Sequence, residues 1–123
     1  MSLYRIIGGD VGTKLIFTVR EWPIGTAPTP NTLAPIVNLA TATSLKLIII
    51  PPPTVLSQGV AQQTVTATLY TDGTDGNLTY TTISGDIPAL PFGSAPQLWQ
   101  VRPMFTLSGW TGKGEPDFFY VDP

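Results

Sequence analysis

The chain has 123 residues, a length typical of one domain with one hydrophobic core. Its formal net charge is −2 and charged residues make up only 11% of it, so it lacks the basic stripe by which proteins bind nucleic acid. It contains no cysteine and no histidine, which excludes disulfides and removes the side chain most often used in acid–base catalysis. No apolar run reaches the ~20 residues of a membrane span, and the first residues do not form a secretion signal. We therefore expect one soluble intracellular domain over residues 1–123 that binds neither nucleic acid nor membrane.

In the first half of the chain, the order of apolar and polar side chains predicts three strands. Residues 13–20 alternate with a period of two, the pattern of a strand with one face on a core. Residues 37–39 predict a short strand, and residues 44–50 a longer one that is buried on both faces. The three prolines at 51–53 should end this strand, because proline has no N–H group to pair with a neighbour.

The middle of the chain predicts a hairpin. Residues 60–70 alternate again, and the two Asp-Gly pairs that follow are the turn signal for a partner strand over residues 77–83. Glycine and proline then recur over residues 84–96, which predicts an irregular crossing to the next strand.

The last third of the chain predicts two more strands. Residues 97–107 alternate, and Pro103 within them should place that strand at a sheet edge or in a bulge. The glycine-rich residues 108–115 predict a hairpin loop around Trp110, and residues 117–121 a short final strand. The whole pattern, about seven strands without a helical period, predicts an all-β, antiparallel sandwich.

Between the first two predicted strands lies a long loop over residues 21–35. Its prolines can join neither a sheet ladder nor a helix, so this loop should run over the surface. Long irregular loops are either solvated connectors or functional segments, and both interpretations stay open here.

Catalytic or metal-binding groups are hard to find in this sequence. The eight carboxylates lie mostly beside glycine or proline, where aspartate commonly bonds to the backbone of a turn. Asp72, Asp75 and Asn77 superficially resemble a calcium loop, but the acidic residues are three apart and no helix follows. We therefore predict no enzyme activity, no metal site and no cofactor.

The tryptophans offer the clearest candidates for contact surfaces. Trp99 alternates in register with apolar neighbours, which predicts a core position. Trp110 lies in the glycine-rich segment and is the aromatic residue most expected at the surface. Together with other aromatic side chains it would offer a surface on which a sugar could stack.

Five segments carry a resemblance to a known family. They are residues 9–19 (GDVGTKLIFTV), 37–47 (VNLATATSLKL), 76–80 (GNLTY), 99–103 (WQVRP) and 118–121 (FFYV). With these segments the chain resembles the amino-terminal immunoglobulin-like domain of the baseplate upper protein family of tailed bacteriophages. The resemblance implies an immunoglobulin-like fold and a virion structural module that joins neighbouring subunits. The longer 21–35 loop departs from that pattern, and a free-standing copy should decorate or bridge an assembly rather than carry a fibre.

The expected function is therefore attachment within a phage particle, after synthesis in the host cytoplasm. The expected partners are other virion proteins of the tail, baseplate, fibre or capsid, together with further copies of the chain. Sheet edges and two loops should make these contacts. The residues expected to bind partners are Trp22, Pro23, Pro28, Pro30, Pro35 and Trp110. The alternative is a carbohydrate-binding adhesion module that holds a cell-surface glycan on an exposed aromatic platform.

Overall fold

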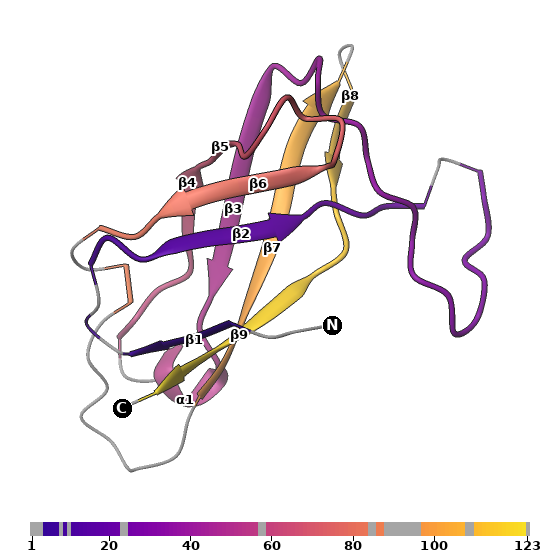
Figure 1. Ribbon diagram of the computed structural model, residues 1–123. Coiled ribbons are helices and arrows are strands. Elements are labelled where there is room, and N and C mark those ends of the chain that lie inside the picture. The colour runs from indigo at the N-terminus through magenta and orange to yellow at the C-terminus, as the bar shows by residue number, and fades with distance from the viewer. Residues whose placement is uncertain are drawn as a thin grey trace.

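The computed structural model describes residues 4–7, 9, 11–22, 25–56, 59–83, 86–87, 97–107 and 110–122. Over these residues the chain forms nine strands and one short helix, arranged as two facing sheets (Figure 1). The elements are β1 (Tyr4–Ile7), β2 (Lys14–Thr18), β3 (Ser44–Ile50), α1 (Pro53–Leu56), β4 (Gln63–Thr66), β5 (Thr68–Leu69), β6 (Asn77–Thr81), β7 (Gln97–Leu107), β8 (Trp110–Lys113) and β9 (Asp117–Asp122). The predicted all-β class is confirmed. No helix among the described residues is long and apolar enough to cross a membrane.

The larger sheet has the strand order β1-β9-β7-β3-β4, and β8 pairs with β7 beyond the end of β9. The smaller sheet has the order β2-β6-β5. All pairs are antiparallel except β1 with β9, which run parallel. The predicted antiparallel pairing therefore holds for the other strand pairs, and β1 with β9 is an exception that the sequence pattern did not predict. The reason is that β1, which precedes the first predicted strand, pairs with the last strand of the chain.

The core lies between the two sheets and is built from alternate residues of their strands. Phe17 of the smaller sheet packs against Phe119 of the larger one, with ring centroids 6.4 Å apart. Trp99 lies 6.0 Å from Phe119, centroid to centroid, and is only 1% exposed, so its predicted core position is confirmed. Burial of each large apolar side chain contributes about 1.5–3 kcal/mol, so this layer is a main source of the sandwich's stability.

Residues 37–39 do not form the predicted strand. The Val37 N–H bonds to the Val19 carbonyl at 2.9 Å, whereas the Leu39 N–H bonds to the Gly73 carbonyl at 2.8 Å. The segment thus bonds to two different parts of the chain and builds no ladder with either. An isolated bridge joins Arg20 to Ile36 just before it.

The single strand predicted for residues 60–70 is divided between the two sheets. Its first part, β4, pairs with β3, and its second part, β5, pairs with β6. The change occurs at Ala67, which is 5% exposed and whose N–H still bonds to the Leu45 carbonyl at 3.0 Å. Alternation continues through the change, and for this reason the sequence pattern reads as one strand.

Pro103 lies in the middle of the larger sheet, so its predicted place at an edge is wrong. The other predicted place, a bulge, agrees with one side of β7, where the pairing shifts by one residue between Val101↔Asp117 and Met104↔Lys113. β7 has β3 along one side, and along the other it has β9 at residues 97–101 and β8 at residues 104–107. Pro103 falls between β9 and β8, and its carbonyl accepts the Gly114 N–H at 2.9 Å on that side. Because the N–H and carbonyl of a strand residue point the same way, the group that proline lacks would face this gap.

The two proline and glycine signals near the middle of the chain are confirmed. β3 ends at Ile50, directly before the three prolines, and α1 begins at the last of them. The Asp-Gly hairpin joins β5 to β6 through the Tyr70 N–H, which bonds to the Asn77 carbonyl at 3.0 Å. Gly73 and Gly76 adopt φ angles of 96° and 70°, which side chains other than that of glycine rarely tolerate. Most of the crossing predicted for residues 84–96 lies outside the described residues.

Candidate functional site

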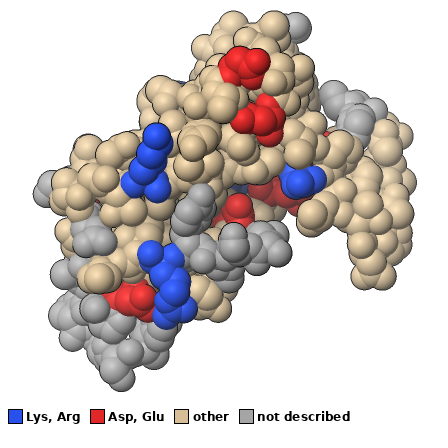
Figure 2. All heavy atoms as spheres, viewed as in Figure 1, with Lys and Arg blue, Asp and Glu red and all other residues tan. Residues whose placement is uncertain are grey.

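An open groove runs beside β2, with a volume of about 580 Å³. One wall is the outer side of β2, and the other is the segment that joins β8 to β9. The loop that follows β2 closes one end, and Figure 2 shows this loop projecting from the body with a hollow between them. We call this feature the edge groove; it is lined by Ile16, Thr18, Arg20, Trp22, Thr32, Leu33, Ala34, Asn77, Glu115, Pro116 and Asp117.

β2 is the last strand of the smaller sheet and has no partner among the described strands on the side away from β6. The residues just before and just after β2 show which backbone groups point toward β6. The Val19 N–H bonds to the Gly76 carbonyl at 2.8 Å, and the Thr13 carbonyl accepts the Thr82 N–H at 2.9 Å. In an antiparallel strand the intervening residues direct their N–H and carbonyl groups to the opposite side. The backbone groups of Ile16 and Thr18 therefore face the edge groove.

The base of the loop is fixed by hydrogen bonds near the end of β2. The Arg20 guanidinium donates from Nη1 to the Ala34 carbonyl at 2.9 Å, and the Glu21 N–H bonds to the Pro35 carbonyl at 3.0 Å. Residues 25–33 are exposed, and Leu33, next to this base, has 62% of its surface in contact with solvent. The loop therefore has a fixed base and presents apolar side chains next to the groove.

The predicted partner-binding residues of this loop occupy different positions. Trp22 is half-buried and lines the edge groove. Pro28, Pro30 and Pro35 are exposed in the loop but do not line the groove. Pro23 lies outside the described residues.

Trp110 belongs to β8 and not to a hairpin loop, so that prediction is wrong for residues 110–113. This segment pairs with β7 because its backbone continues the ladder past the turn. The Trp110 ring meets Phe105 edge-on, with centroids 5.5 Å apart, and the residue is 37% exposed. It does not line the edge groove, so the structure does not bring it into one site with Trp22.

Glu21 and Trp110 both approach Gly112. A Cβ atom placed on Gly112 would lie 2.9 Å from Glu21 Oε2 and 2.8 Å from the Trp110 ring, so both side chains pack against this glycine. Oε2 is buried and has no hydrogen-bond partner among the described residues. Burial raises the pKa of the Glu21 carboxyl, the charge of Glu115 raises it further, and Arg102 partly opposes them.

The wall of the groove opposite β2 carries negative charge from Glu115 and Asp117. The Glu115 N–H bonds to the Arg20 carbonyl at 2.6 Å, which fixes this wall to the end of β2. Of the nearby cationic groups, Arg20 bonds to a loop carbonyl and Arg102 donates from Nε to the Gly114 carbonyl at 3.2 Å. The edge groove therefore combines backbone groups that pair with no other described strand, one tryptophan and an acidic wall.

The other carboxylates of interest, Asp72 and Asp75, serve the hairpin turn as predicted. Asp72 accepts both the N–H and the hydroxyl of Thr74, at 3.0 and 2.7 Å, and Asp75 accepts the Thr71 hydroxyl at 2.7 Å. These hydrogen bonds lower the pKa of both carboxyls. Within the described part of the chain, no group of three or more acidic, histidine or cysteine side chains could hold a metal ion.

Sequence reasoning found only the loop side of this groove. Ile16 and Thr18 were expected as ordinary members of a strand, and residues 115–117 were not singled out. No motif marks them, because the site arises only when the ends of β2 and β9 meet in space.

No family model, no curated protein and no solved structure matches the chain. The fold and the groove together describe a small β-sandwich in which the edge strand β2 lies beside a projecting, proline-rich loop.

Proposed function

We propose that this protein is an attachment module that binds other proteins of a larger assembly, and that the assembly is a bacteriophage virion. The observation that carries the first part is the open edge of β2 inside the edge groove. Exposed strand edges pair readily with other chains, so they are usually short, covered or charged. Here the edge lies in a hollow beside an exposed loop, an arrangement suited to receiving a partner.

The strand order supports the immunoglobulin-like part of the resemblance. Immunoglobulin sandwiches place their second, fifth and fourth strands in one sheet and their third, sixth and seventh in the other. The smaller sheet here, β2-β6-β5, and the run β9-β7-β3 of the larger sheet follow the same order if β4, after β3, and β8, between β7 and β9, are both added strands. The virion setting rests on the five sequence segments described above, and we propose that several copies act in each particle.

The test is whether the protein is a fixed component of particles. Antibodies against the purified protein would be used to blot density-gradient fractions of the virus that encodes it. We expect the protein to follow the major capsid protein through the gradient at a constant ratio. Protein that stays in the soluble fractions, with none in washed particles, would contradict the virion setting.

A second candidate function, glycan binding, is favoured by one observation. Trp22 lines the groove together with Asn77 and Asp117, which gives an aromatic surface with polar neighbours. The sugar platform that we propose is therefore Trp22 and not Trp110. A glycan array would test it: Trp22→Ala should abolish binding while Trp110→Ala retains it, and an array without any bound glycan would remove this candidate.

A further inference from the structure

Taking the proposed attachment function as its basis, we infer that the edge groove binds an extended segment of a partner protein as an added strand on β2. We further infer that this segment carries a lysine or arginine that faces Glu115 and Asp117.

The free backbone groups of β2 define the mode of binding. Ile16 and Thr18 direct their N–H and carbonyl groups into the groove, and an extended peptide supplies the complementary groups at matching spacing. The carbonyl of Arg20, the next residue with this orientation, is already bonded to the Glu115 N–H at 2.6 Å. One backbone hydrogen bond therefore already exists on this side of the chain, just beyond β2. An added strand would extend this pairing toward the start of β2.

β2 is longer than the other strands at the ends of the two sheet orders. It has five residues, whereas β1 and β4 have four each and β5 has two. The charged side chains near β2, Lys14 and Arg20, lie at its two ends, so its middle has no charge to repel a neighbour. The volume of about 580 Å³ also falls within the roughly 300–1,000 Å³ that ligand sites occupy.

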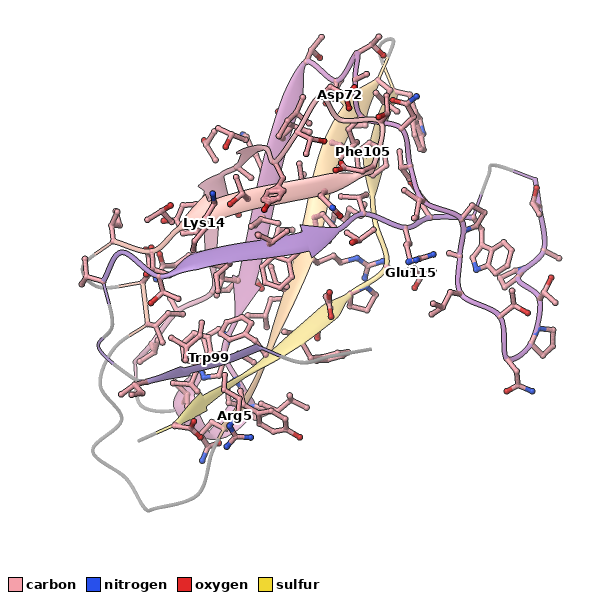
Figure 3. The ribbon with its side chains drawn as sticks, in the orientation of Figure 1. Arg5, Lys14, Asp72, Trp99, Phe105 and Glu115 are labelled. Carbon is pink, nitrogen blue, oxygen red and sulfur yellow. The ribbon has the colours of Figure 1, made fainter. Side chains whose placement is uncertain are left out.

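The charge of the opposite wall selects the partner's side chain. Figure 3 shows Glu115 near the place where the chain leaves β2 for the loop, and Asp117 follows at the start of β9. Arg20 is held by the Ala34 carbonyl at the closed end of the groove, and Glu21 adds negative charge behind the wall. Arg20 keeps its positive charge when it donates to the neutral Ala34 carbonyl, so it offsets only one of the two carboxylates that line the groove. A basic side chain of a partner would balance the other.

The probe is a fluorescent nine-residue peptide of alternating threonine and valine with lysine at its centre. Its control has glutamate at the centre. We expect the lysine peptide to bind roughly two- to fivefold more tightly, as for a partly solvated ion pair. Glu115→Lys should reverse this preference, and the amide protons of Ile16 and Thr18 should exchange more slowly when the peptide is bound.

Matched variants separate backbone pairing from folding. Thr18→Pro removes a backbone N–H that faces the groove, whereas Thr64→Pro makes the same change on the outer side of the edge strand β4. Thr18→Val keeps the N–H and removes the hydroxyl that donates to Asn77 Oδ1 at 2.6 Å. With folding checked by circular dichroism, we expect only Thr18→Pro to lose peptide binding.

Failure of this inference can be told apart from failure of the proposed function. If neither peptide slows amide exchange at Ile16 and Thr18, or if Thr18→Pro binds like the parent, strand addition at β2 is wrong. If the protein is nevertheless found in washed particles, attachment stands and uses another surface. Equal binding of the two peptides with protected amides would overturn the charge part alone.

Discussion

Glu21 is a carboxylate placed where its charged form is poorly accommodated. Its Oε2 is buried against Gly112 and Trp110, and Glu115 is a nearby like charge. The pKa of Glu21 in the folded protein is therefore raised above the ordinary 4.5. As pH rises from 4.5, the unfolded chain releases this proton first, so the contribution of Glu21 to stability is lost as pH rises through the folded-state pKa.

We predict that Glu21→Gln increases the free energy of unfolding at pH 7 and has little effect near pH 3. The expected gain is below about 1 kcal/mol, because the side chain is partly solvated. Urea unfolding at both pH values measures it. A variant that is less stable than the parent at pH 7 would show that the ionised carboxylate has a favourable partner, with Arg102 as the candidate.

Tyr80, in β6, makes a hydrogen bond to the buried carboxylate of Asp86. Its hydroxyl donates to Asp86 Oδ2 at 2.5 Å, and the same oxygen accepts the Ile83 N–H at 2.9 Å. Asp86 is 3% exposed. Burial, followed by the hydrogen bond and charge of Asp86, raises the pKa of Tyr80 from 10.0 to about 12.

We predict that an absorbance titration of the folded protein shows one phenol that ionises near pH 12 and that Tyr80→Phe removes this step. Because the unfolded chain loses the proton near pH 10, the stability that this group contributes should decline between pH 10 and 12. Below that window Tyr80→Phe should cost about 1–3 kcal/mol, since Asp86 loses a donor. A titration curve identical in the variant and the parent would contradict the assignment.

At the scale of elements, the Asp-Gly hairpin is held against the segment that passes beneath it. Gly73 has a φ of 96°, and a Cβ atom there would lie 2.7 Å from the backbone nitrogen of Ala40. Gly12 has a similar φ of 84° but no atom within 4 Å of such a Cβ. A side chain at either position would therefore meet the same backbone strain, but only at Gly73 would it also meet a steric clash.

We predict that Gly12→Ala costs about 1 kcal/mol, from backbone strain alone. Gly73→Ala should cost at least about 2 kcal/mol, because the hairpin must also move away from Ala40. Thermal and urea unfolding of both variants give the comparison. Equal losses would mean that the hairpin shifts freely and that its contact with Ala40 contributes little.

Local sequence patterns predicted the strands that pair with one neighbour for most of their length, such as β3 and β7. The prolines mark the end of β3, and the alternation of apolar and polar residues along β7 follows the burial of its side chains. The division of β4 from β5 and the central place of Pro103 depend on which strand lies alongside, and no local pattern records that choice. Residues 37–39 have a strand-like pattern but form no strand, because their backbone hydrogen bonds go to two different segments.

At the scale of the whole molecule, the edge groove shows why site prediction from sequence was incomplete. Trp22 was predicted from its loop, but Thr18 and Asp117 meet only because β2 and β9 belong to different sheets that approach at one side. Low charge leaves that edge without the usual protection against pairing. The same feature that supports attachment therefore predicts self-association where no partner is present.

The most direct test of attachment through this groove is hydrogen exchange of β2 in the free protein and in protein bound within purified particles. We predict that the Ile16 and Thr18 amides exchange freely in the isolated protein and become protected in the particle. The amides on the outer side of β4, such as that of Thr64, should not change and serve as the internal control. Protection at β4 with unchanged exchange at Ile16 and Thr18 would contradict attachment through the edge groove.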